Sequence, residues 1–406
     1  MQTRRQFLKG AAVAGAGIAA SPILSTPARA FSRTSSADPV KVGLCVPLSG
    51  VLALYGKQSK IGAELAVAQL NAKGGILGRK VELSVQDDEG TPAGALRVMR
   101  KFAIQDRVDF TLGTIASSER EAVIDFLMKR KLPLVYFQFY EGGASDKYLF
   151  CTGANPDTLG GAAYIPWLVK NQGPKVYFLG WDYIANTKIS AGFKKWLPKA
   201  GGELVGKTVV PFTTTDFTPM LRNAQAAKPD VIYNGMYGSA AFLETLTQLG
   251  IKKTTHVTAW AFDSLFLKTL SKPAAANLSW AAEWDNTTKP LPGKVNADFL
   301  TALRAKFGRN VPLGLDVQAA YAGFLYYAKA VAKAKSLDPD AVSQAFDGLT
   351  FESPAGNLRM SPDNHNVDLP VRTFVSGGKG REYVVSVASQ GQGKNPNWSK
   401  RNWQHS

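Results

Sequence analysis

The chain has 406 residues, of which 48 are Lys or Arg and 31 are Asp or Glu, so its formal net charge is +17. This length leaves room for two domains, and a hydrophobic share of 45% excludes disorder, a collagen-like fibre and a coiled coil as the main architecture. Two cysteines and three histidines are too few for a disulfide scaffold or a four-cysteine zinc site, and they leave little for histidine-based catalysis. We expect neither a metal nor a cofactor.

The first thirty residues have the composition of an export signal. Paired arginines followed by Phe-Leu-Lys lie in Thr3–Lys9, an apolar Gly/Ala-rich stretch covers 11–24, and Ala28-Arg29-Ala30 has the spacing that a signal peptidase accepts. The pattern resembles the twin-arginine signal of bacteria. A membrane anchor is the alternative, but the apolar stretch is shorter than the roughly 20 residues of a spanning helix. We therefore expect residues 1–30 to be a signal peptide and the mature protein to be periplasmic.

Basic residues are scattered along the whole chain and alternate with acidic ones. We interpret the positive charge as that of a solvated surface with some attraction for anionic ligands, and we expect no nucleic-acid partner. No second apolar run is long enough to span a bilayer, so we expect a soluble mature protein.

Strand and helix patterns alternate through the first half of the mature chain. Thr91-Pro92 predicts a helix start, and Ser118-x-x-Glu121 reads as a capping box. The predicted strands are 40–46, 81–85, 108–112 and 132–138, and the predicted helices are 58–72, from 91 onward, and from 118 to 130. Strands separated by helices imply a parallel sheet with right-handed crossovers.

The same alternation restarts near Asn155-Pro156. The predicted strands are 176–179, 205–210, 231–235, 257–261 and 278–284; helices are expected near 186–198, 217–227, 239–249, 294–307, 316–335 and 338–348; and strand-and-turn chemistry returns over 351–387. The sequence thus predicts an α/β protein with two doubly wound parallel-sheet lobes. Because such sheets bind ligands beyond the carboxyl ends of their strands, we expect a ligand cleft between the lobes.

Several motifs resemble the bacterial solute-binding proteins for branched-chain amino acids. They are Val42-Gly43, Pro47-Leu48-Ser49-Gly50, Tyr55-Gly56, Gly62–Ala66, Asn71–Arg79, Asp87-Asp88, Gly113–Ser118 and Lys228-Pro229-Asp230. The resemblance implies the type I periplasmic binding fold, in which two lobes joined by a three-strand hinge close on a ligand that is passed to an ABC permease. We expect lobe 1 to comprise 38–155 and 285–350, and lobe 2 to comprise 156–284 and 351–406.

Other stretches resemble the urea- and short-amide-binding members of this family. They are Tyr136–Gly142, Gly180–Tyr183, Phe351–Gly356 and Asn364-His365. The chain lacks cysteines near Gly90 and Ala116, where leucine-type members form a disulfide. A disulfide between Cys45 and Cys151 is the alternative in an oxidising periplasm, but we expect free thiols because the two lie in predicted strands at different positions of the sheet. Bulky residues at 138–140 replace the small residues that those members place at the ligand, which argues against a plain aliphatic amino acid.

The candidate ligand-binding residues follow predicted strands or begin predicted helices. They are Tyr55, Ser117, Gln138, Tyr140, Tyr183, Tyr237 and Asp263. Ser117 lies at a helix start, where free N–H groups suit a carboxylate or amide oxygen, and its family position favours a ligand role over a plain N-cap. Asp263 either accepts hydrogen bonds from a ligand ammonium or amide NH₂, or caps a helix over 265–270. We expect Trp181 and Trp260 to be core residues.

We therefore predict a monomeric binding protein for a small polar ligand of amide, urea or amino-acid type. An aromatic-acid-binding member of the same family and a ligand sensor are alternatives within this fold, and the export signal argues against the sensor. An exported α/β enzyme is the alternative from another class. It would need a catalytic constellation, and we find none: Gly-x-Ser-x-Gly is missing, and Asp87 and Asp88, as strand neighbours, should point to opposite faces.

Overall fold

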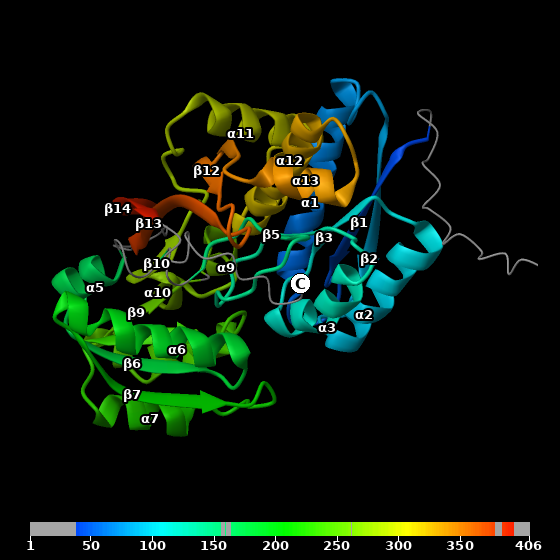
Figure 1. Cartoon of the computed structure of the whole chain (residues 1–406). Coiled ribbons are helices and arrows are strands. Elements are labelled where there is room, and N and C mark those ends of the chain that lie inside the picture. The colour runs from blue at the N-terminus through cyan, green and yellow to red at the C-terminus, as the bar shows by residue number, and fades with distance from the viewer. Residues whose placement is uncertain (1–37, 156–158, 160–163, 261, 378–383, 394–406) are drawn as a thin grey trace, which may run out of the picture. The chain divides into compact units, whose positions relative to one another are not determined.

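The computed structural model describes residues 38–155, 159, 164–260, 262–377 and 384–393, so the twin-arginine segment lies outside the described residues. Within the compact unit Pro39–Ser406, strands and helices alternate as the sequence predicts and form two sheets (Figure 1).

The first sheet is wholly parallel, with the strand order β2-β1-β3-β4-β5. Its strands are β1 (Val40–Val46), β2 (Val81–Asp87), β3 (Phe110–Gly113), β4 (Leu134–Tyr136) and β5 (Leu149–Cys151). Its helices are α1 (Ala53–Ala72), α2 (Pro92–Arg100), which continues as a π-helical turn over Lys101–Asp106, and α3 (Ser117–Met128). Alternate residues of β1 belong to different core clusters: Cys45 packs with α2 and α3, whereas Leu44 packs with α1. The two faces are therefore covered by different helices, as in a doubly wound fold.

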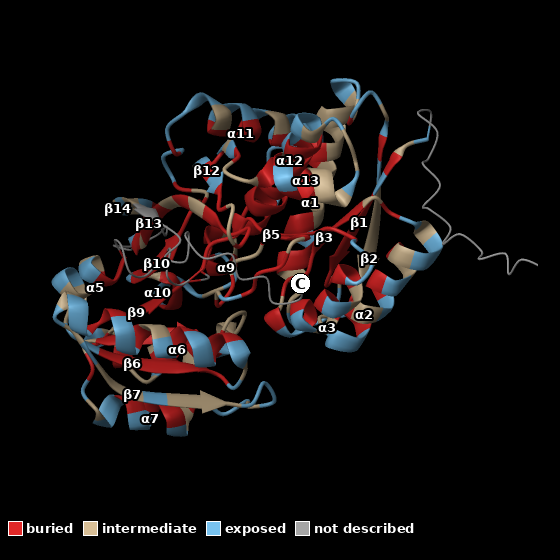
Figure 2. Ribbon diagram, in the orientation of Figure 1, coloured by how far each residue is buried: buried red, intermediate tan, exposed pale blue. Residues whose placement is uncertain are grey.

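The second sheet is mixed, with the order β11-β12-β13-β10-β9-β8-β6-β7 and β14 paired with β13. Its strands are β6 (Lys175–Trp181), β7 (Glu203–Val210), β8 (Val231–Gly235), β9 (His256–Ala259), β10 (Leu278–Ala282), β11 (Thr350–Ser353), β12 (Gly356–Met360), β13 (Val367–Gly377) and β14 (Val384–Gly393). Strands β6 to β10 pair in parallel, and β6 is buried along most of its length whereas the edge strand β7 is half-buried (Figure 2).

The second sheet is parallel over β6 to β10, as predicted, but its C-terminal part is antiparallel, which the sequence pattern did not indicate. Strands β11 to β14 are antiparallel to their neighbours, and β13 is antiparallel to β10. The turn between β11 and β12 is too short for a crossover helix: Ser353 accepts a hydrogen bond from Ala355 N–H at 3.2 Å, and Gly356 has a φ of 113°. A tight connection of this kind can only join antiparallel strands.

The remaining helices lie between the strands of the second sheet or after β10. They are α5 (Ile165–Gln172), α6 (Ile184–Trp196), α7 (Thr218–Ala226), α8 (Ala240–Gln248), α9 (Ser264–Leu267), α10 (Lys272–Ala275), α11 (Lys294–Phe307), α12 (Leu315–Ala334) and α13 (Pro339–Phe346), with short 3₁₀ turns at Pro198–Ala200 and Ile251–Lys253. Helix α12 packs along α1, and Gly62 permits this close approach because a Cβ there would lie 2.1 Å from the carbonyl oxygen of Val317. Helix α12, late in the chain, thus covers the face of the first sheet on which α1 lies. The predicted boundaries of the two lobes stay a prediction.

One of two predicted helix N-termini agrees with the structure. Thr91 caps α2 as predicted, accepting a hydrogen bond from Gly94 N–H at 3.0 Å. The predicted capping box of Ser118 and Glu121 was wrong, because α3 begins at Ser117 and the side chain that reaches back is Glu119. Its Oε2 accepts from Ala116 N–H at 2.9 Å and from Ile115 N–H at 3.2 Å.

The cysteines Cys45 and Cys151 are free and fully buried. They lie on β1 and β5, which are separated by two strands and hence by roughly 14 Å at the usual strand spacing. A disulfide needs Cα atoms within about 7 Å, so the fold keeps the two thiols apart.

We predict that both thiols are unreactive in the native protein, because burial raises the pKa of Cys151 to about 12 and, with the nearby Asp88, raises that of Cys45 well above its usual range. A thiol reagent should find two thiols in denatured, unreduced protein and essentially none in native protein. Finding none after denaturation would contradict the fold at this point.

A second prediction concerns the stability of α3. Burial, together with the charge of Asp88, raises the pKa of Glu119 to about 8, so folding favours the protonated acid. Stability from this group is present at pH 4 and is lost as the pH rises from the ordinary value near 4.5 through 8. The Glu119→Gln variant keeps an oxygen for both N–H groups, and it should be more stable than wild type at pH 8 by about 1–3 kcal/mol and little different at pH 4.

The measurement is chemical denaturation of both proteins across this pH range. Glu64→Gln is the matched control, because Glu64 is a half-buried residue of α1 whose ion pair with Lys60 lies at the surface. A stability gain in Glu119→Gln that does not depend on pH would contradict the explanation.

Candidate functional site

The candidate residues all follow the carboxyl ends of parallel strands. Ser117 follows β3, Gln138 and Tyr140 follow β4, Tyr183 follows β6, Tyr237 follows β8 and Asp263 follows β9, while Tyr55 lies in the first turn of α1 after β1. In open α/β sheets this edge is where ligands bind. The structure brings most of these residues together, although they come from two different sheets.

Three tyrosines form the centre of this group. The hydroxyl of Tyr55 receives a hydrogen bond from the backbone of Gly238, next to Tyr237. Enclosure by protein, with the neighbouring Tyr237 and Glu141, raises the pKa of Tyr183 well above its usual range, and enclosure likewise raises the pKa of Tyr237, which lies beside Tyr233. The phenols therefore stay protonated at any physiological pH.

Carboxyl and amide side chains lie beside Tyr55. Burial and the charge of Asp263 and Glu283 raise the pKa of Asp316, and Gln138 hydrogen-bonds its carboxyl group. Within the described residues, Asp316 Oδ1, Gln58 Oε1 and Gln138 Oε1 are buried acceptors with no hydrogen-bond partner. We refer to Tyr55, Gln58, Gln138, Tyr183, Tyr237 and Asp316 as the acceptor cluster.

Asp263 is the N-cap of α9, which confirms one of the two roles expected for it. Its Oδ1 accepts from Phe266 N–H at 2.6 Å, and its Oδ2 accepts from Gln58 Nε2 at 3.3 Å and from Leu315 N–H at 3.2 Å. Both carboxylate oxygens are thus used inside the protein. Asp263 ties together α9, α1 and the start of α12, and so it positions Gln58 and Asp316.

Ser117 belongs to a buried ionic network that sequence reasoning missed. Its hydroxyl donates a hydrogen bond to Glu141 Oε2, and Glu141 Oε1 accepts from Arg120 Nη2 at 2.6 Å. The side chains of Arg120 and Glu141 are both fully buried. Glu141 was visible in the Tyr-x-x-x-Tyr-Glu-Gly stretch, but nothing in the sequence marked Arg120 as its partner.

Tyr140 does not join the acceptor cluster. It is buried beneath it, where its hydroxyl donates to Asn366 and its ring contacts that of Tyr136 at a centroid distance of 5.6 Å. The guanidinium carbon of Arg120 lies 5.1 Å from the centre of the Tyr140 ring. The structure therefore places Tyr140 as a support for the ionic network.

Aromatic rings connect the loop after β4 to the second sheet. Phe139 lies edge-on to Tyr237 at 6.4 Å and to Trp260 at 6.3 Å between ring centroids. Trp260 and Trp181 are buried core residues, as expected. Among these described aromatic residues, Phe139 lies at the site but was not predicted as a ligand-binding residue. Its position next to Gln138 was the signal that could have identified it.

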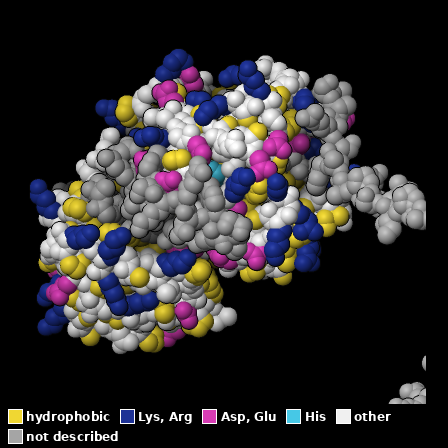
Figure 3. Space-filling view, in the orientation of Figure 1, with side chains coloured by type: hydrophobic (Ala, Val, Ile, Leu, Met, Phe, Trp, Pro, Cys, Tyr) yellow, Lys and Arg dark blue, Asp and Glu magenta, His cyan; other side chains and the backbone are white. Residues whose placement is uncertain are grey.

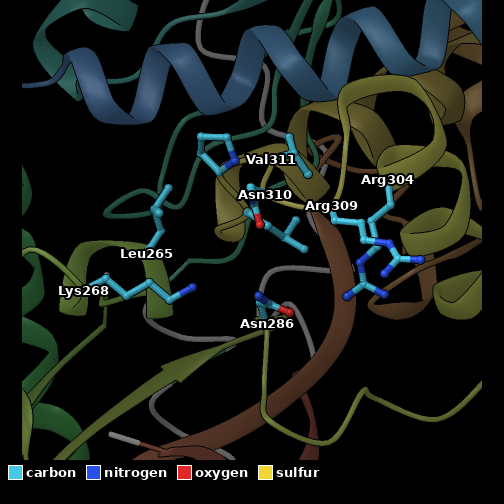
Figure 4. A pocket seen from close by; sticks show the side chains of 9 residues that line it. Leu265, Lys268, Asn286, Arg304, Arg309, Asn310 and Val311 are labelled. Atoms are coloured by element: carbon cyan, nitrogen blue, oxygen red, sulfur yellow. The ribbon is translucent and has the colours of Figure 1, made fainter. Parts of the chain in front are cut away.

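Charged side chains also line a pocket away from the acceptor cluster. Lys and Arg are spread over the face seen in Figure 3 and mixed with Asp and Glu. An open pocket with a volume of about 350 Å³ lies between α9, the end of α11 and the segment 309–313. In Figure 4, Lys268 extends into it from one side and Arg304 and Arg309 from the other, with Asn286 between them. Its lining includes none of the predicted ligand residues.

Among the described residues, no helix has both the length and the apolar character needed to cross a membrane. No group of three or more His, Cys, Asp and Glu side chains in that part of the chain is placed to hold a metal ion. Asp87 and Asp88 diverge as predicted, since Asp87 accepts from Leu48 N–H at 2.8 Å while Asp88 is buried beside Cys45.

Comparison with known proteins gives a consistent result. Residues 39–380 match a family model described as periplasmic binding protein, and residues 1–21 match the signal sequence of the TAT (twin-arginine translocation) pathway. A curated relative from Pseudomonas aeruginosa, the leucine-, isoleucine-, valine-, threonine- and alanine-binding protein, is 27% identical over 84% of this chain and 91% of its own length.

Two solved structures share the fold. A solute-binding protein of an ABC transporter from Rhodopseudomonas palustris BisB5, in complex with 3,4-dihydroxybenzoic acid, is 23% identical, with a TM-score of 0.77 over 89% of this chain and 99% of that one. An amino acid ABC transporter substrate-binding protein from Pseudomonas fluorescens Pf-5 is 22% identical, with a TM-score of 0.78 over 90% and 99%.

These matches and the two α/β sheets confirm the type I periplasmic binding fold, and the signal sequence confirms export to the periplasm by the twin-arginine route. The chain belongs to the periplasmic binding protein family, as a substrate-binding protein of the ABC transporter type.

Proposed function

We propose that this protein captures a small polar ligand with N–H groups, of amide, urea or amino-acid type, between its two lobes and delivers it to the permease of an ABC importer. The observation that carries this proposal is the acceptor cluster, in which three buried oxygen atoms, on Gln58, Gln138 and Asp316, have no partner within the described residues. A buried acceptor without a partner costs free energy, so a ligand that donates to it gains affinity.

The charges around the acceptor cluster support the same ligand class. Asp263 and Glu283 lie close enough to raise the pKa of Asp316, and Arg372 is the cation that acts on Glu283. A ligand with N–H groups or a positive charge relieves this crowding of acids, whereas a bare carboxylate adds to it. The hydroxyls of Tyr55 and Tyr183 remain as donors for the ligand's carbonyl oxygen, whereas the hydroxyl of Tyr237 shares a hydrogen bond of 2.7 Å with that of Tyr233.

We further propose roles for the individual residues. Tyr55, Ser117, Gln138, Tyr183 and Tyr237 contact the ligand, while Asp263 and Tyr140 position them. The interactions of Asp263 with Gln58 and of Tyr55 with Gly238 join the two sheets directly, which suits lobes that close over a ligand. The signal peptide is removed after residue 30, and the mature protein acts as a monomer without catalytic activity.

An aromatic acid is the second candidate ligand. Phe139, Tyr183 and Tyr237 offer rings on which such an acid could stack, and a structural relative was solved with 3,4-dihydroxybenzoic acid. The two candidate ligands differ in their hydrogen-bonding groups. An amide or urea has N–H donors for the acceptor cluster, whereas an aromatic carboxylate presents further acceptors to it.

A thermal-shift screen of amides, urea, amino acids and aromatic acids separates these candidates. A ligand at 100 times its dissociation constant stabilises the protein by about 2.7 kcal/mol, which is readily detected. We expect stabilisation by ligands that carry N–H groups. Stabilisation by aromatic carboxylates alone would overturn the proposal in favour of the second candidate.

The Asp316→Ala variant tests whether Asp316 accepts a hydrogen bond from the ligand. Affinity for an N–H ligand found in the screen should fall about ten- to a hundredfold, because a buried hydrogen-bond acceptor for the ligand is lost. Without ligand, the variant should be more stable than wild type at pH 7, and this gain in stability should be smaller at pH 4. The reason is that the raised pKa of Asp316 makes its ionisation unfavourable in the folded state.

Calorimetric titration and denaturation measure the two effects. Asp298→Ala is the control, since Asp298 is an exposed residue of α11 paired with Lys294, and it should change neither quantity appreciably. An Asp316→Ala protein that binds as tightly as wild type would remove Asp316 from the site.

A further inference from the structure

The side chain of Glu141 is held as a carboxylate by its partner. Arg120 is a permanent cation, and its Nη2 lies 2.6 Å from Glu141 Oε1 inside the protein, where neither side chain has any exposed surface. The same Nη2 also lies 2.6 Å from Oε1 of Glu121, a partly exposed residue, so Arg120 is shared by two carboxyl groups. Glu141 is the fully buried one, and a buried carboxyl group at this distance from a guanidinium is stabilised as the carboxylate. An ionised carboxyl group can only accept hydrogen bonds.

This fixes the direction of the hydrogen bond between Ser117 and Glu141. A serine hydroxyl has one proton and two lone pairs. Since Glu141 Oε2 has no proton to give, the single proton of Ser117 lies on the bond between them, and Ser117 Oγ has only lone pairs left to offer. The usual role of a serine at a helix start, donating to a ligand oxygen, is therefore blocked here.

We propose that Ser117 acts toward the ligand as a hydrogen-bond acceptor, and that Glu141, held by Arg120, is the positioning residue that imposes this polarity. The inference rests on the proposed function, because it assumes that the ligand reaches Ser117. It deepens that function by assigning an N–H group, as in a carboxamide or urea, to the end of the ligand at α3.

The surroundings of Ser117 also favour a ligand N–H group over a carboxylate. Glu119 Oε2 already occupies the N–H groups of Ile115 and Ala116 in front of α3. Glu141 lies close enough to Tyr183 and Tyr237 to act on their pKa values, so its negative charge is felt where the ligand would bind. A carboxylate ligand at this position would meet a lone pair of Ser117 and the charge of Glu141 together.

Matched pairs of ligands test this assignment, because a carboxamide and its carboxylate have nearly the same shape and differ in hydrogen-bond donors. The probes are propionamide with propionate and benzamide with benzoate, titrated by calorimetry. Wild type should bind each amide at least tenfold more tightly than its acid, since a site built to accept from an N–H group rejects an analogue without one.

The Ser117→Ala variant removes the acceptor and leaves the ion pair of Arg120 and Glu141 intact. We expect amide affinity to fall about three- to tenfold, with acid affinity unchanged or improved, so that the preference largely disappears. Ser118→Ala is the control, because Ser118 is the exposed neighbour on the same helix turn, and it should keep the wild-type preference.

The Glu141→Gln variant reverses the polarity. The Gln side chain can donate to Ser117 Oγ, which frees the serine proton for a ligand oxygen, so acid affinity should rise relative to amide affinity. If this variant fails to fold because Arg120 keeps only the partly exposed Glu121 as its partner, the Ser117→Ala result decides alone.

The outcomes separate the inference from the function on which it rests. If wild type binds the amides and Ser117→Ala lowers acid affinity more than amide affinity, or leaves their ratio unchanged, the acceptor role is overturned while the proposed function stands. If wild type binds the acids and no amide, the proposed function itself fails, and the inference fails with it.

Discussion

The buried ion pair of Arg120 and Glu141 is the interaction on which the candidate site depends. It joins α3 to the loop after β4, the two segments that supply Ser117, Gln138 and Phe139. The rings of Tyr136 and Tyr140 lie 4.8 and 5.1 Å from the guanidinium carbon and complete its enclosure. Removing both charges from water is costly, and a buried pair of this kind is often no more stabilising than apolar residues. Its value here lies in fixing the position and polarity of the groups around it.

A second set of contacts joins the two sheets. Asp263 bonds to Gln58 of α1 and to the start of α12, and Tyr55 meets the backbone of Gly238. These contacts use polar groups whose partners belong to different parts of the fold, so they would have to break if the lobes moved apart. The acceptors that they leave without partners, on Gln58, Gln138 and Asp316, offer a ligand the means to stabilise the arrangement described here.

The sequence supported a detailed prediction of the fold, because the positions of helices and strands follow from periodicity and capping residues that are local in the chain. The strand Val40–Val46 and the cap of Thr91 are examples. The antiparallel end of the second sheet was missed because strand direction depends on which strand a hairpin joins, and the periodicity of 351–387 is the same for both directions. The capping residue of α3 was misassigned by two positions because the true N-cap, Ala116, has no capping side chain and so gives no signal, whereas Ser118 and Glu121 have the spacing of a capping box.

The site was harder to predict for a physical reason. Topology places residues at the edges of the sheets, so Tyr55, Tyr183 and Tyr237 could be named from their distance to predicted strands. Which of them have free hydrogen-bonding groups depends on partners far away in the chain. Asp263 is satisfied by Gln58, 205 residues earlier, and Tyr140 is engaged by Asn366, 226 residues later. Local patterns contain no information about such pairs.

In the proposed arrangement, Glu141 holds the proton of Ser117 and so sets the polarity of the site. Neutron diffraction from a crystal of the deuterated protein with a bound amide locates that proton directly. We expect scattering density for deuterium between Ser117 Oγ and Glu141 Oε2, with an amide N–D of the ligand directed at Ser117. Deuterium on Ser117 directed at a ligand oxygen, away from Glu141, would contradict it.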